Sequence, residues 1–140
     1  MIKIINQQLW LPIFFGISAC SLMPHWACHY YRIETGSSFV VGSYSFTILE
    51  SIFSMIIYSV LIGMNLYSIA FSNLRFIAVF LSGIMHITLG MIHVIRIVNP
   101  FEFIVFGYPW STDASLREII IVFPFGIICL AVARSIYRIT

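Results

Sequence analysis

The chain has 140 residues, of which 61% are hydrophobic and only 9% are charged, and its mean hydropathy is +1.03. A water-soluble domain carries about 25% charged residues, so this composition excludes a soluble protein and indicates an integral membrane protein. The net charge is only +2 and the basic residues are scattered without forming a patch, which argues against a nucleic-acid partner.

The first predicted span covers residues 9–28 and is followed by an aromatic and basic segment, residues 29–32. Pro24 lies near the far end of this span, where we expect it to kink or break the helix. The apolar run after Lys3 leads to residues 17–20, which resemble the cleavage site of a bacterial lipoprotein signal peptide at Cys20. However, the polar residues 6–8 interrupt this run, and it continues beyond Cys20. We therefore expect this segment to be retained rather than removed as a signal peptide.

Three further spans are predicted at residues 39–66, 76–98 and 116–137. The second is rich in β-branched residues, but an open strand cannot satisfy its backbone in lipid, so we expect a helix there. The connection over residues 99–115 is apolar and too short to cross a bilayer, which predicts an interfacial or re-entrant segment. The expected fold is an all-α membrane protein, an antiparallel four-transmembrane-helix bundle that forms a single domain over residues 1–140.

The residues of the first two spans do not visibly resemble those of the last two, so we predict no internal repeat. More basic residues flank the side that holds both termini than the opposite side, and the positive-inside rule then places both termini in the cytoplasm.

Two polar residues, Glu50 and His86, are predicted to lie level with each other near the membrane midplane. With the second span starting at residue 39, Glu50 lies about 18 Å deep, and His86 lies about 16 Å deep from the other side. A carboxylate inside the membrane is costly without a partner, so we expect these two side chains to form an intramembrane pair. Its role is either structural or the coupling of a proton or cation.

Three other histidines, His25, His29 and His93, are predicted to lie at one interface of the membrane. His93 lies about 10.5 Å beyond His86 along the same helix, which matches the depth of the end of the first span. The three side chains are candidates for a transition-metal or haem site. The alternative is that His25 and His29 belong to an aromatic belt and that His93 makes only hydrogen bonds between helices.

The remaining polar and small residues of the third span are interpreted as structural. Gly83 and Gly90 are expected to let helices pack closely, and Arg96 is expected to reach the interface or to pair with Glu102. The sequence contains no HExxH, GxSxG, Walker A or GxGxxG motif, so no local motif indicates a catalytic mechanism; the question of an enzyme stays open, and a non-enzymatic role is favoured.

Three functions follow as hypotheses, in this order. The first is a non-catalytic accessory subunit of a larger membrane complex, with other membrane subunits as partners. The second is a small proton- or cation-coupled transporter that uses Glu50 and His86 and works as a homodimer, because four helices are too few to enclose a path alone. The third is a metal- or haem-binding redox protein that uses His25, His29 and His93.

Overall fold

The computed structural model describes residues 2–138, and the side chains of residues 10–138. Four long helices make up most of it: α1 (Ile2–Thr35), α2 (Ile48–Ala70), α3 (Arg75–Val98) and α4 (Thr112–Tyr137). All four are long and apolar enough to cross a membrane. This is the helix content expected of a multi-pass membrane protein.

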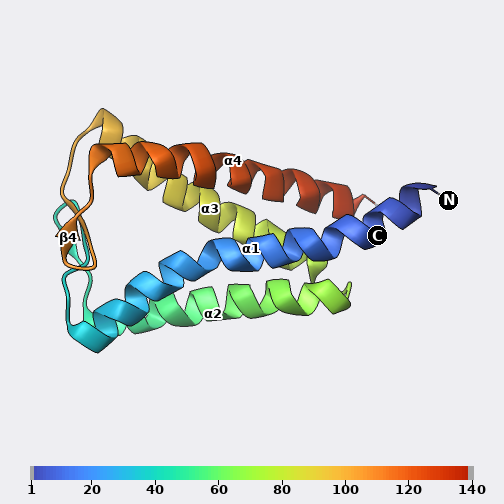
Figure 1. Ribbon diagram of the computed structural model, residues 1–140, viewed down its shortest axis with the longest axis horizontal. Helices are drawn as coiled ribbons and strands as arrows, with labels where there is room; N and C mark the ends of the chain where they lie inside the picture. Colours follow the sequence, from blue (N-terminus) through green and yellow to red (C-terminus); the bar gives the residue numbers. More distant parts are fainter. Residues whose placement is uncertain (1, 139–140) are drawn as a thin grey trace.

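The helices form two pairs, in which α1 packs along α2 and α3 packs along α4. Figure 1 shows that the two pairs lie close together near the chain termini and spread apart toward the other end of the molecule. The arrangement has the shape of a wedge.

The wide end of the wedge carries a small β-sheet that the sequence did not lead us to expect. Its strands are β1 (Val40–Val41), β2 (Tyr44–Ser45), β3 (Phe103–Val105) and β4 (Tyr108–Pro109), in the order β2-β1-β3-β4. Strands β1 and β2 form one hairpin and β3 and β4 another, and the two hairpins join by antiparallel pairing of β1 with β3. The segment predicted as interfacial or re-entrant is thus a β-hairpin.

The second helix begins at Ile48 and not at residue 39, because Thr47 starts it with a capping box. The Thr47 side chain accepts a hydrogen bond from the backbone of Glu50, and the Glu50 carboxylate accepts one from the backbone of Thr47. The β-branched residues before this cap form strands, since here each strand finds a partner.

The first helix is longer than predicted and runs through Pro24 to Thr35 without a break. Near the termini, side chains of α1, α3 and α4 form a close-packed apolar core, with Phe15, Val79 and Cys129 fully buried. A second, smaller core around Leu22 and Leu61 holds α1 against α2. These two cores fix the narrow end of the wedge and leave the wide end to the sheet.

Candidate functional site

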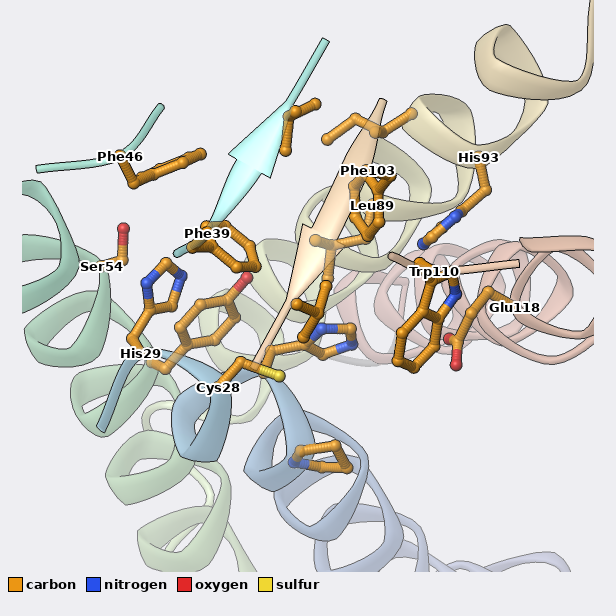
Figure 2. A pocket seen from close by; sticks show the side chains of 16 residues that line it. Cys28, His29, Phe39, Phe46, Ser54, Leu89, His93, Phe103, Trp110 and Glu118 are labelled. Atoms are coloured by element: carbon orange, nitrogen blue, oxygen red, sulfur yellow. The ribbon is translucent and has the colours of Figure 1, made fainter. Parts of the chain in front are cut away.

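A cavity of about 260 Å³ lies at the wide end, between the two helix pairs and against the sheet. Figure 2 shows Cys28 and His29 on one side of it, His93, Trp110 and Glu118 on the other, and the Phe39 and Phe103 rings between them. Its full lining is Pro24, His25, Cys28, His29, Phe39, Val41, Phe46, Ser54, Tyr58, Leu89, Ile92, His93, Phe103, Val105, Trp110 and Glu118.

The sheet covers one side of the cavity and is called its roof below. Alternate residues of a strand face the same side of a sheet, so every second residue of a strand can line the cavity. Phe103 and Val105 are buried and line the cavity, whereas Ile104 between them does not line it. On the neighbouring strand, Val41 lines the cavity. The short strands therefore present one apolar face to the helices.

Two histidines sit beneath this roof, each 6% exposed and each against a phenylalanine. The His29 ring lies 5.0 Å from the Phe39 ring, and the His93 ring lies 5.1 Å from the Phe103 ring. The Phe39 and Phe103 rings are 6.3 Å apart. A row of four rings thus runs from α1 to α3 across the cavity.

The two histidines differ in their hydrogen bonds. Nδ1 of His93 lies 3.1 Å from the hydroxyl of Ser115. Among the side chains described, Nδ1 of His29 is a buried atom without a hydrogen-bond partner, and so is the hydroxyl of Ser51. A buried polar group without a partner costs free energy, so His29 is a group that a ligand or water would satisfy.

Two arginines hold the hairpins over the ends of the helices. Arg32 donates hydrogen bonds to the backbone carbonyls of Ser37 and Phe46. Arg96 donates to the carbonyls of Phe101, Trp110 and Ser111 and to the hydroxyl of Ser115. The expected pairing of Arg96 with Glu102 is replaced by this set of carbonyls, which a planar guanidinium can reach in several directions.

The predicted histidine cluster can now be placed. His25, His29 and His93 all line the cavity, and the His25 ring stacks on Tyr58 at 5.8 Å. Within residues 2–138, no group of three or more His, Cys, Asp or Glu side chains is arranged to hold a metal ion. The three histidines therefore line one cavity, but their side chains are not arranged around a common point where a metal ion could bind.

The predicted pair of Glu50 and His86 does not form. Glu50 lies in the first turn of α2, where it caps the helix and accepts a hydrogen bond from the Tyr44 hydroxyl. This hydrogen bond raises the pKa of Tyr44 above its usual value. The depth estimate was wrong because it started the helix at residue 39, and a start at Ile48 leaves Glu50 near the sheet.

His86 instead belongs to a polar contact among three helices. Its Nδ1 donates to the Ser82 carbonyl at 2.7 Å, so in a neutral ring Nε2 is an acceptor for the Ser21 hydroxyl at 2.9 Å, whose one proton is shared with the Ser18 carbonyl at 2.8 Å. The Asn65 side chain donates to the Ser82 hydroxyl at 2.8 Å. These bonds tie α1, α2 and α3 together beyond the cavity and occupy both nitrogens of His86.

The two glycines of α3 lie where α4 approaches most closely. A Cβ atom on Gly83 would lie 2.8 Å from the Leu130 side chain, and one on Gly90 would lie 2.8 Å from Cβ of Phe123. Gly126 of α4 has the same relation to Ile87 of α3. Small residues therefore set the spacing between these two helices.

Sequence reasoning missed Cys28, Tyr58, Trp110 and Glu118 as members of one site. Each is a common type of residue near a membrane interface, and because they lie on α1, α2, α4 and the segment before α4, only the tertiary fold brings them together. No protein family, curated protein or solved structure matches this chain.

Proposed function

We propose that this membrane protein binds a small lipid-soluble molecule in the cavity beneath the sheet. The observation that carries the proposal is the composition of the lining: apolar side chains form most of it, five of them phenylalanine, tyrosine or tryptophan, and it also contains a few polar side chains, His25, His29 and Glu118 among them. Sites for small molecules are mostly apolar cavities with a small number of placed polar groups.

The unsatisfied Nδ1 of His29 gives further support. A buried nitrogen in an otherwise apolar wall is stabilised when a ligand supplies the missing hydrogen bond. The cavity volume of about 260 Å³ is below the range of drug-sized pockets, which favours a ligand of the size of one substituted ring.

A cavity-filling variant tests the proposal. Leu89 lines the cavity, so Leu89→Trp should fill part of it and expel the ligand. The matched control is Ile84→Trp, because Ile84 lies on the same helix, is 44% exposed and does not line the cavity. Both variants are purified in mild detergent and examined by native mass spectrometry. We expect a bound small molecule on the unaltered protein and on the control but not on Leu89→Trp; equal occupancy of all three would contradict the proposal.

The role of accessory subunit remains a separate proposal that binding in the cavity does not exclude. It draws support from the outward faces of α2 and α4, where large apolar side chains such as Phe53 and Ile121 are more than half exposed. Lipid covers such faces as well as a partner does. Stoichiometric copurification of another membrane subunit in mild detergent would support this role, and a monodisperse single species would argue against it.

A further inference from the structure

Several residues of the first half of the chain recur in the second half at a constant spacing of 64 residues, the separation of His29 from His93. The predicted absence of an internal repeat is therefore wrong: apolar spans hide the match, because most of their positions hold interchangeable residues. Some of the identical pairs are isoleucines or leucines within the helices. The others are Ser18 and Ser82, His29 and His93, Arg32 and Arg96, Phe39 and Phe103, Val41 and Val105, Tyr44 and Tyr108, and Ser51 and Ser115.

The contacts of the two halves recur at the same spacing. Arg32 donates to the carbonyl of Phe46, and Arg96 donates to that of Trp110, which is the equivalent position. Thr47 caps α2, and the equivalent Ser111 caps α4. Matching hydrogen bonds at matching positions are hard to obtain from unrelated segments, so the halves are copies of one α–hairpin–α unit.

The two units are related by a pseudo-twofold axis through the middle of the sheet. Val40 pairs with Ile104, its own equivalent, and the strands on either side have the same register. An axis at this point runs between the two helix pairs of Figure 1, and the cavity beneath the sheet is lined by residues of both pairs.

The cavity wall follows this symmetry. Almost every lining residue has its equivalent in the lining, as the following pairs show: His25 and Leu89, Cys28 and Ile92, His29 and His93, Phe39 and Phe103, Val41 and Val105, Phe46 and Trp110, and Ser54 and Glu118. Only Pro24 and Tyr58 lack an equivalent in the wall. The site therefore lies at the interface between repeats, where membrane transport proteins built from repeats also place their ligands.

From this symmetry we propose that the ligand is a flat ring with polar atoms at two opposite ends, the chemical class of the 1,4-quinones and hydroquinones, which lies against the Phe39 and Phe103 rings with one polar end toward His29 and the other toward His93. The proposal rests on the proposed binding function and adds the class of ligand. A ring with two opposed polar atoms matches two equivalent histidines, and the row of rings formed by Phe39 and Phe103 supplies flat apolar surface between them.

Each of the two histidines has a ring nitrogen that makes no hydrogen bond within the described part of the chain. Among the described side chains, Nδ1 of His29 is buried without a partner, and no hydrogen bond involves Nε2 of either His29 or His93. A neutral histidine offers one donor and one acceptor, so it can bond either to a quinone carbonyl or to a hydroquinone hydroxyl. Some equivalent positions of the lining hold different residues, such as Ser54 and Glu118. These differences make the two halves of the cavity unequal, so a ring that carries a tail on one side would bind in one orientation.

Binding of two probes to the full-length protein in lipid nanodiscs tests the proposal. The first probe is a decyl-substituted 1,4-benzoquinone, and the second is 4-decylphenol, which has the same tail but a single polar end. The quinone is read by saturable quenching of tryptophan fluorescence, corrected with a Trp110→Phe protein since Trp110 lines the cavity, and the phenol is read by its competition with the bound quinone. We expect the quinone to bind about fivefold more tightly than the phenol, the effect of one additional hydrogen bond.

Variants of the two histidines complete the test. His29→Leu and His93→Leu should each weaken quinone binding about fivefold, and His29→Gln and His93→Gln, which keep an N–H donor, should bind nearly as well as the unaltered protein. If a leucine variant does not fold, the glutamine variants and the comparison of probes still decide. Cys20→Ala, a change on the exposed face of α1, is the control.

The outcomes separate the two proposals. Equal binding of both probes, or a loss with only one of the two leucine variants, overturns the two-ended ligand and leaves binding in the cavity standing. Absence of saturable quenching by the quinone, together with no effect of Leu89→Trp on any bound molecule, overturns both.

Discussion

At the scale of single residues, the wide end of the molecule depends on Arg32 and Arg96. Each guanidinium lies near the last turn of a helix and donates to carbonyls of the hairpin that follows it. Charged donors to carbonyls form stronger hydrogen bonds than neutral donors, and several bonds from one rigid group fix the angle between helix and hairpin. The arginines thus position the roof of the cavity.

Replacement of Arg96 by lysine should show this role. A lysine ammonium cannot reach all of the acceptors of Arg96, so Arg96→Lys leaves hairpin carbonyls without partners and should lower the free energy of unfolding by about 2 kcal/mol. The measurement is a titration with denaturing detergent in mixed micelles. Arg117→Lys should change the free energy of unfolding little, because Arg117 is exposed and its side chain makes no hydrogen bond within the described part of the chain. Equal stability of the two variants would show that the hydrogen bonds of Arg96 to the hairpin carbonyls do not stabilise the protein.

At the scale of elements, α3 and α4 pack closely because glycines face larger side chains across their interface. Gly90 has Cβ and Cα of Phe123 within 3.1 Å of the place where its own Cβ would lie. By contrast, apart from its chain neighbours and the backbone of its own helix, Gly63 of α2 has no atom within 4 Å of that place. The two glycines therefore differ in function although both lie inside membrane helices.

This contrast gives a matched pair of substitutions. Gly90→Ala forces α3 and α4 apart and should destabilise the protein by about 1–3 kcal/mol, whereas Gly63→Ala should be neutral or slightly stabilising, since alanine favours the helix. The same detergent titration measures both. Two variants of equal stability would show that α3 and α4 are not in close contact at Gly90.

The elements also show what the sequence alone could predict. Four spans, their order and the closeness of His25, His29 and His93 could be predicted, because helix length and depth follow from apolar runs. The hairpins could not, because Phe39 to Phe46 has the composition of a membrane span, and only pairing with the second hairpin makes strands of it. The error in the depth of Glu50 followed from that one misplaced helix start.

At the scale of the whole molecule, two copies of one unit enclose a site that neither copy has alone. Each unit contributes a histidine, a phenylalanine and a hairpin, and the paired strands β1 and β3 close the cavity from above. The repeat could have been predicted from His29, Arg32 and Phe39 and their equivalents, had the two halves been compared at a fixed spacing. The cavity required the structure, because its walls come from both halves.

The central claim is that the two hairpins join in one sheet over this cavity, and a disulfide between them tests it most directly. Val40→Cys and Ile104→Cys are introduced together into a chain whose Cys20, Cys28 and Cys129 are replaced by alanine, and membranes are oxidised under mild conditions. Residues opposite each other in antiparallel strands lie about 4.5–5.5 Å apart, within disulfide reach.

The pair Ser45→Cys and Ile104→Cys is the control, because β2 and β3 are separated by β1 in the sheet. We predict an intramolecular disulfide, seen as a thiol-dependent shift on gel electrophoresis, for the Val40 and Ile104 pair and none for the control. No disulfide in the first pair, or equal disulfide formation in both, would contradict the joined sheet and the enclosed site beneath it.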